Sequence, residues 1–291
     1  MNRLVSIDGE IVPPERATVS VYDRGFLYGD SVFETIRTYG GVPFALPDHM
    51  ARLGRSAALV AMPLPLSIGA FEAEVRTAVT AAANAESYVR AMVTRGSGPL
   101  GLDPSEARHP LRVILVEPLH LPPPEVYRAG VGVITRRTER AGDAVHGAKV
   151  GNYLASMLAL AAARAAGAHE ALILDAAGRV VEGTTSNVFV VRDGRLCTPP
   201  LAVGILPGIT RAHLLAVAPG AGVAVDETPL EVSDVLGADE VFLSSSLREV
   251  LPVVRVDGRT IGSGHPGPVT RRLHEAFRRS VGLSGTPMPW E

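Results

Sequence analysis

Short apolar stretches bounded by turn residues predict strands in several parts of the chain. Asp8-Gly9 and Gly40-Gly41 each lie between two such stretches, which is typical of a hairpin turn. The predicted strands and hairpins cover residues 4–12, 32–39, 42–46, 88–95, 111–118, 131–135, 171–175, 187–191 and 241–243.

Other stretches repeat apolar residues every three or four positions, which is the period of a helix. The predicted helices cover residues 48–61, 67–84, 154–166, 209–217 and 269–281. Ser67 is a suitable N-terminal cap for the second of them, and Gly167 a natural stop for the third. One face of the third helix carries Leu154, Met157, Leu158, Ala161, Ala162 and Ala165.

Strands and helices are mixed along the chain without regular βαβ alternation, which favours an α+β architecture. The length of 291 residues is sufficient for two domains. Three consecutive prolines, Pro122 to Pro124, cannot continue a helix or a strand ladder and favour an extended linker. We therefore expect a small N-terminal α/β domain over residues 1–119, a Pro-rich interdomain linker over 120–130, and a larger C-terminal cofactor-binding domain over 131–291.

Composition excludes several classes of function. Hydrophobic residues make up 46% of the chain and the formal net charge is −2, so a packed core is expected and attraction to nucleic acid or to a membrane surface is not. Cys197 is the only cysteine, which excludes an internal disulfide and a cysteine-based metal site and is consistent with the cytoplasm. No apolar run has the length of a signal peptide or a membrane span.

Lysine usage gives the sharpest chemical indication. Lys149 is the only lysine among 28 lysine and arginine residues. A GC-rich genome accounts for the preference for arginine but not for the lysine that remains. An amine can lose its proton and form an imine, whereas a guanidinium cannot, so the retained lysine points to chemistry at this position.

Three further features match parts of a phosphate-bearing cofactor site. Gly208 precedes the predicted helix at 209–217, and free N–H groups at a helix N-terminus bind anions, although ordinary capping gives the same pattern. Ser244-Ser245-Ser246 follows a predicted strand and is either a second phosphate contact or a polar turn. Glu182 ends an apolar run and needs a partner, which is either a protonated ring nitrogen or an arginine. An amine, phosphate donors and an acid are what pyridoxal 5′-phosphate requires.

The chain resembles fold-type IV pyridoxal-phosphate enzymes, which include branched-chain aminotransferases, D-amino-acid aminotransferases and aminodeoxychorismate lyases. The resemblance extends over nearly the whole chain. It is carried by seven blocks in the family's order, at residues 23–30, 32–37, 49–53, 149–154, 182–187, 204–211 and 242–246.

This resemblance implies roles for individual residues. Lys149 is the catalytic residue that forms the imine with pyridoxal 5′-phosphate and moves the proton. The other implied cofactor-binding residues are Glu182 at the pyridine nitrogen, Tyr153 near the phenolic oxygen, Leu206 on the ring, and Arg52, Ile209, Thr210, Ser245 and Ser246 at the phosphate. The family also implies two α/β-type domains with the cofactor in the cleft between them, no metal, and a homodimer or higher homo-oligomer.

The substrate class is expected to be amino acids and 2-oxo acids. Tyr88-Val89-Arg90 resembles the Tyr-x-Arg of branched-chain enzymes, where the arginine recognises glutamate; a strand-face pair without a ligand is the alternative. Tyr28, Phe33 and Arg37 also match pocket positions, and Leu247 follows the serine run where branched-chain enzymes have a small residue.

The principal hypothesis is transfer of the amino group of branched-chain L-amino acids to 2-oxoglutarate. A D-amino-acid aminotransferase, an aminodeoxychorismate lyase and a non-catalytic cofactor-binding protein remain alternatives. The block at residues 182–187 is closer to the D-amino-acid pattern. However, Leu100 and Leu102 stand where D-amino-acid enzymes place an arginine and a histidine.

Overall fold

The computed structural model describes residues 2–137 and 147–291, and the chain divides into two compact units. Unit 1 comprises Met1–His120 and Ala148–Tyr153, and unit 2 comprises Leu121–Gly147 and Leu154–Glu291. The domain ranges expected from the sequence differ from these units in one way that matters for function, because they place Lys149 in the second domain. Residues 148–153 instead join unit 1, where Val150 forms a β-bridge with Val32.

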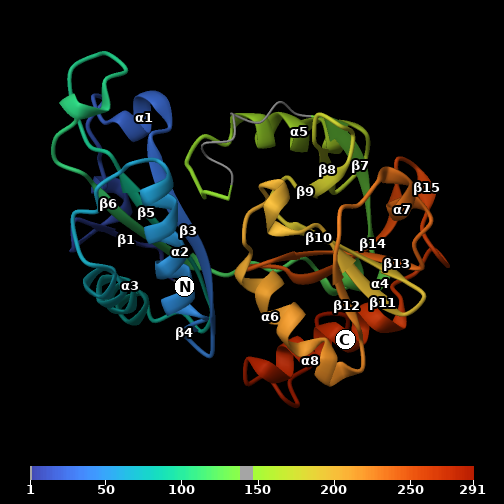
Figure 1. The fold of residues 1–291 in the computed structure, drawn as a ribbon. Helices are drawn as coiled ribbons and strands as arrows, with labels where there is room; N and C mark the ends of the chain where they lie inside the picture. Colours follow the sequence, from blue (N-terminus) through green and yellow to red (C-terminus); the bar gives the residue numbers. More distant parts are fainter. Residues whose placement is uncertain (1, 138–146) are drawn as a thin grey trace. The chain divides into compact units, whose positions relative to one another are not determined.

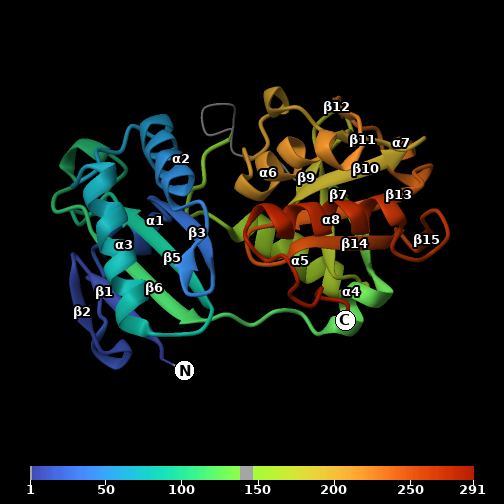
Figure 2. The same ribbon diagram turned by 90° about the horizontal axis from the view of Figure 1, so that it is seen from below.

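Unit 1 is built on an antiparallel sheet, shown in Figures 1 and 2, with strand order β2-β1-β6-β5-β3-β4. The strands are β1 (Leu4–Ile7), β2 (Glu10–Val12), β3 (Ser31–Tyr39), β4 (Val42–Pro43), β5 (Ser87–Thr94) and β6 (Arg112–Pro118). The helices are α1 (Arg24–Tyr28), α2 (Leu46–Leu59) and α3 (Ile68–Ala82), with short 3-10 turns at Pro14–Arg16 and Pro104–Glu106.

Helices α2 and α3 cover one face of this sheet (Figure 1). The core between them contains Met50 and Leu53 of α2, Phe71 and Val75 of α3, and alternate residues of the strands such as Ile36. Since successive strand residues point to opposite faces, the other residues of β3 and β5 lie on the face away from these helices.

Unit 2 contains a mixed sheet whose described strands follow the order β12-β11-β10-β13-β14-β7-β8-β9, with β15 beside β14. The strands are β7 (Val131–Arg137), β8 (Glu170–Leu174), β9 (Val180–Gly183), β10 (Asn187–Arg192), β11 (Arg195–Thr198), β12 (Val225–Glu227), β13 (Glu240–Ser245), β14 (Glu249–Val256) and β15 (Arg259–Thr260).

The helices of unit 2 are α4 (Pro124–Ala129), α5 (Leu154–Ala165), α6 (Ile209–Val217), α7 (Val232–Leu236) and α8 (Pro268–Ser280), with 3-10 turns at Leu201–Val203 and Pro219–Ala221. Helix α5 packs on β8 (Figure 1), and α6 and α8 pack against each other and against β13. No helix in residues 2–137 or 147–291 is both long and apolar enough to span a bilayer.

Most of the predicted elements are present. The hairpin at Asp8-Gly9 and the helix at Ile209–Val217 are confirmed, and Ser67 caps α3 by accepting a hydrogen bond from the backbone N–H of Ala70. The expected linker over 120–130 differs in that it contains α4, whose Tyr127 is buried in the core of unit 2.

The apolar face of α5 is the second difference. Ala159 and Ala163 are the buried residues of this helix, whereas Leu154, Met157 and Leu158 of the predicted apolar face are exposed. Small alanines allow the helix to approach β8 closely, and the larger apolar side chains point to solvent.

Candidate active site

The backbone of Lys149 is held between a strand and a helix of unit 1. Its N–H donates to Ser56 Oγ of α2 at 3.0 Å, and its carbonyl accepts from the N–H of Phe33 in β3 at 3.0 Å. The neighbouring bridge between Val32 and Val150 extends this attachment. The half-buried side chain of Lys149 therefore extends from a backbone that hydrogen bonds hold on both sides.

Aromatic rings surround this amine. Lys149 Nζ lies 3.3 Å from Tyr153 Oη and 4.6 Å from the centre of the Phe33 ring. The rings of Phe33 and Tyr153 meet edge to face with centres 5.3 Å apart, and the guanidinium of Arg90 lies 3.7 Å from the centre of the Phe33 ring. Two residues that the family resemblance implies, Phe33 and Tyr153, thus lie at Lys149, and a third, Arg90, lies over the Phe33 ring.

The four predicted substrate residues of β3 and β5 share one face of the sheet. Arg90 pairs in register with Thr35, and Tyr88 with Arg37, so both lie on the side of β3 that carries Phe33. This is the face away from α2 and α3. Arg37 is buried, and its guanidinium lies 4.2 Å from the centre of the Tyr39 ring.

Arg52 belongs to a buried charged cluster that the sequence did not reveal as a unit. Its Nε and Nη2 donate to the two carboxylate oxygens of Glu34 at 2.8 and 2.6 Å, and His49 Nδ1 lies 2.7 Å from Glu34 Oε2. Burial by itself would raise the pKa of Glu34, but the hydrogen bonds and charge of Arg52, with a contribution from His49, lower the pKa to about 2. Burial lowers the pKa of His49, with smaller opposing contributions from Glu34.

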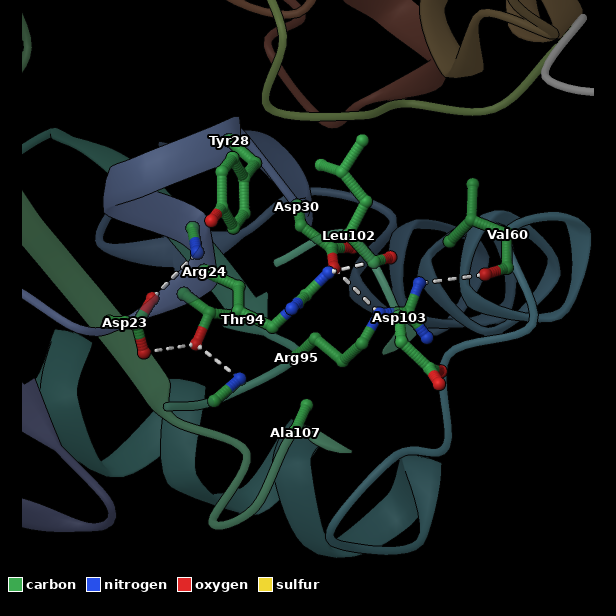
Figure 3. A network of polar contacts seen from close by, with 12 residues as sticks. Asp23, Arg24, Tyr28, Asp30, Val60, Thr94, Arg95, Leu102, Asp103 and Ala107 are labelled. Carbon is green, nitrogen blue, oxygen red and sulfur yellow. Dashed lines mark hydrogen bonds and ion pairs between the residues drawn. The ribbon is translucent and has the colours of Figure 1, made fainter. Parts of the chain in front are cut away.

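Tyr28 is fixed by a polar network at the start of unit 1 (Figure 3). Asp30 Oδ2 accepts from Arg24 Nε at 3.2 Å and from Arg95 Nε at 2.7 Å. The guanidinium of Arg24 then lies 5.1 Å from the centre of the Tyr28 ring, and Tyr28 Oη accepts from the N–H of Gly101 at 3.2 Å.

The loop that contains Leu100 and Leu102 is held by the same network. Arg24 Nη1 and Nη2 donate to the carbonyl oxygens of Gly101 and Leu102. The side chains of Leu100 and Leu102 are both exposed. The network therefore fixes the backbone of the loop and leaves two large apolar side chains at the surface.

In unit 2, Glu182 and Leu206 are joined directly. Glu182 Oε2 accepts from the N–H of Leu206 at 3.0 Å, and Asn187 Nδ2 donates to the Leu206 carbonyl at 3.0 Å. The glycine two residues later has no room for a side chain, because a Cβ on Gly208 would lie 2.0 Å from Asn187 Oδ1. Glu182 and Asn187 therefore hold the loop that leads into α6, because together they bind the backbone N–H and the carbonyl oxygen of Leu206.

Helix α6 begins without a side-chain cap. Its N-cap is Gly208, and no side chain accepts a hydrogen bond there. Ile209 and Thr210, both predicted as phosphate ligands, are its first two residues and are buried. Uncapped N–H groups at a helix start favour an anion.

The serine run lies at the end of β13. Ser245 and Ser246 are half-buried, and Ser245 Oγ accepts from Arg248 Nε at 3.1 Å. Ser244 Oγ is buried and has no hydrogen-bond partner within the described part of the chain. Leu247 follows in the turn between β13 and β14.

Sequence reasoning did not single out Ser56, Asn187 or the pair Glu34 and His49. Glu34, His49 and Asn187 were present only as members of the family blocks. The need of a buried carboxylate for partners would have pointed to Glu34, but its burial was not evident from the sequence. No cluster of metal-binding side chains occurs within residues 2–137 and 147–291.

Comparisons with known proteins relate the chain as a whole to one family. The model of the amino-transferase class IV family matches residues 31–256. A putative branched-chain-amino-acid aminotransferase of Methanocaldococcus jannaschii is 40% identical over 276 residues, covering 94% of this chain and 95% of its own. A D-alanine aminotransferase of Bacillus licheniformis is 33% identical, covering 95% and 96%.

A solved structure gives the same relationship in three dimensions. The branched-chain amino acid aminotransferase of Escherichia coli has a TM-score of 0.91 and 33% identity, covering 99% of this chain and 97% of its own. The α+β fold is therefore confirmed. By its matched residues and its relatives, this chain belongs to the class IV aminotransferases.

Proposed function

We propose that this class IV aminotransferase transfers the amino group of branched-chain L-amino acids to 2-oxoglutarate. The observation that carries the proposal is the cluster at Lys149, in which the only amine side chain lies beside the Phe33 ring with the Arg90 guanidinium over the same ring. An apolar surface and a cation beside one amine suit a pocket that must admit both an aliphatic and an acidic side chain.

Pyridoxal 5′-phosphate is the cofactor of this family, and the described residues fit it. The phosphate requires anion donors, which the uncapped start of α6 supplies, and Ser244 adds a buried hydroxyl without a partner in the described residues. When bound, the cofactor supplies a ring that accepts the electrons released when a proton leaves the substrate.

The residues of this chain then take distinct roles. Lys149 would bind the aldehyde through its amine and would then move the proton, and the hydroxyl of Tyr153 lies close enough to orient that amine. Glu182 would hold a proton on the pyridine nitrogen, and Leu206 would pack against the ring. The phosphate would be held by Arg52, Ile209, Thr210, Ser245 and Ser246. Because Glu34 binds two nitrogens of Arg52, the orientation of this guanidinium is set before any anion arrives.

Phe33 and Tyr28 would form the apolar wall for leucine or valine. Burial of such a side chain contributes about 1.5–3 kcal/mol. Arg90 would bind the distal carboxylate of glutamate, with Tyr88 and Arg37 on the same sheet face. In unit 2, Leu247 of the turn after β13 would be a further substrate contact.

We also propose a homodimer or higher homo-oligomer in the cytoplasm. Leu154, Met157 and Leu158 lie on one face of α5 and are 63%, 63% and 64% exposed. Three adjacent large apolar side chains on one helix face are unfavourable in water, and a second copy of the chain would cover them.

The decisive test is the reaction itself. Purified enzyme reconstituted with pyridoxal 5′-phosphate should form glutamate from L-leucine and 2-oxoglutarate. Lys149→Arg keeps the charge but cannot bind the aldehyde, so it should lose nearly all turnover and the cofactor's visible absorption. Activity with D-alanine but not L-leucine would favour the D-amino-acid alternative, and pyruvate released from aminodeoxychorismate would favour the lyase.

A further inference from the structure

Arg248 joins three separate segments of unit 2. Its Nε donates to Ser245 Oγ at 3.1 Å, Nη1 to Glu170 Oε2 at 2.7 Å, and Nη2 to Thr185 Oγ1 at 3.0 Å. The side chain is only 17% exposed. All three nitrogens of the guanidinium are thus engaged by the protein itself.

Glu170 extends this arrangement on its other oxygen. Glu170 Oε1 accepts from Thr184 Oγ1 at 3.0 Å, from the N–H of Thr185 at 2.7 Å and from Ser186 Oγ at 2.9 Å. The carboxylate is almost fully buried. Burial by itself would raise the pKa of Glu170, but the charge of Arg248 and the Thr185 N–H lower the pKa, so the pair stays ionised.

The two turns that are tied together in this way lie beside proposed cofactor residues. Residues 184–186 connect β9, which bears Glu182 one residue before its end, to β10. Ser245 is the last residue of β13, and Ser246 begins the turn that leads to β14. A shift of either turn would move a cofactor contact, because at most one residue separates each turn from a proposed cofactor residue.

We propose that Arg248 is a positioning residue that acts with Glu170 to hold these two turns in the geometry required for cofactor binding. This inference rests on the proposed function, since it assumes that Glu182 and the serine run contact pyridoxal 5′-phosphate. It also assigns Arg248 no part in recognising an acidic substrate, because its three nitrogens bind Ser245, Glu170 and Thr185.

His169 gives an independent spectroscopic probe of the arrangement. Its Nε2 lies 3.3 Å from Arg248 Nη1. The pKa of His169 is lowered to about 4, first by burial and then by the charges of Arg248 and Arg164, and the charge of Glu170 opposes this shift. Removing the charge of Arg248 should raise this pKa toward its ordinary value, which NMR titration of the imidazole can follow in the apoprotein.

The experiment compares Arg248→Met, Arg248→Lys and Thr185→Val with the wild type and with Arg195→Met. Arg195 forms an exposed two-bond pair with Asp226 in the same unit, so it controls for the loss of an arginine. Pyridoxal 5′-phosphate is titrated into each apoprotein by fluorescence, and half-reactions with L-leucine and L-glutamate are then measured at saturating cofactor.

Arg248→Met should weaken cofactor binding about tenfold, on the scale seen when a group that orients a ligand-binding residue is removed. Arg248→Lys should not restore the affinity, because an ammonium cannot reproduce the three-way fork. Thr185→Val removes the hydroxyl that accepts from Arg248 Nη2 and donates to Glu170 Oε1, but it leaves the Arg248–Glu170 ion pair in place. It should therefore show a smaller loss, and it keeps the test usable if Arg248→Met does not fold. Both donors should lose rate by the same factor.

Wild-type cofactor affinity in Arg248→Met, or full rescue by lysine, would overturn the positioning role. A loss confined to glutamate would instead make Arg248 the acid-recognising residue. If the wild type itself bound no cofactor, the proposed function would fail, whereas the response of His169 to Arg248→Met would still report the contact separately.

Discussion

Arg90 illustrates how the arginines of one chain can differ in their availability to a ligand. Arg248 is engaged on every nitrogen by protein groups, and Arg37 is buried against Tyr39, whereas Arg90 is half-buried and lies over the Phe33 ring. A guanidinium that stacks on an aromatic ring uses its face for that contact. The N–H groups at its edge can still donate hydrogen bonds in the guanidinium plane. Among these three arginines, Arg90 is therefore the best suited to bind a substrate carboxylate.

Replacement of Arg90 by alanine should consequently separate the two substrates. We expect activity toward glutamate and 2-oxoglutarate to fall by on the order of 2–4 kcal/mol in transition-state free energy, and activity toward leucine to fall much less. Half-reactions followed through the cofactor spectrum, one amino donor at a time, measure this asymmetry. Arg76→Ala, at an exposed helix pair with Glu72, is the matched control.

Equal losses for leucine and glutamate would mean that Arg90 binds the shared α-carboxylate or only supports the sheet. An unchanged rate with both donors would mean that Arg37, and not Arg90, binds the distal carboxylate of the acidic substrate.

At the scale of elements, one buried carboxylate adds a polar connection to the apolar packing between β3 and α2. Glu34 of β3 binds Arg52 and His49, which lie almost one turn apart on α2. The same helix supplies Ser56 to the backbone of Lys149. The cluster thus fixes α2 on the sheet, and α2 in turn helps to hold the lysine segment.

The pH dependence of stability follows from the lowered pKa of Glu34. A carboxyl whose folded pKa lies below its unfolded value contributes stability that is complete above the unfolded pKa, near 4.5, and is lost as the pH falls toward about 2. Glu34→Gln should therefore lower the free energy of unfolding at pH 7 by on the order of 3 kcal/mol. The difference from the wild type should shrink between pH 4.5 and 2.

Urea unfolding of both proteins across this pH range provides the measurement. Glu72→Gln, at a partly exposed carboxylate on α3, should change stability little and serves as the control. A constant difference between wild type and Glu34→Gln from pH 7 to pH 2 would show that folding does not lower the pKa of Glu34.

Helices and strands could be predicted from the sequence where the local pattern of apolar and turn residues matches the secondary structure that forms. Alternation and turn residues predicted the β1–β2 hairpin, and helical spacing predicted α3 and α6. Strand β14 was not predicted, because Pro252 stands in the middle of its apolar run and proline argues against an interior strand. The structure accommodates it, since β14 pairs with β7 only from Val253 onward.

At the scale of the whole molecule, the sequence suggests which residues form the candidate site but not which residues pair with them in the fold. Lysine usage pointed to Lys149 and the end of an apolar run to Glu182, and the family blocks added Arg52 and the implied roles. Glu170 and Arg248, which tie together the turns next to the proposed cofactor residues of unit 2, are separated by 78 residues, and one sequence carries no signal for such a pair. For the same reason, the attachment of residues 148–153 to unit 1 could not be read from local pattern.

The last prediction concerns the exposed face of α5 and tests the proposed self-association. Met157 lies at the middle of the three exposed apolar side chains of this face, with Leu154 and Leu158. A glutamate there would place a charge in the proposed apolar contact, and an unpaired buried charge costs several kcal/mol. We therefore expect Met157→Glu to shift the protein to monomers in sedimentation velocity at micromolar concentration, while the control Ile11→Glu, at an exposed apolar residue of β2, leaves the assembly intact. Because α5 packs on β8 through Ala159 and Ala163, the substitution should leave the fold of unit 2 unchanged by circular dichroism. A wild-type monomer, or a Met157→Glu variant that associates as tightly as the wild type, would exclude this face as the contact.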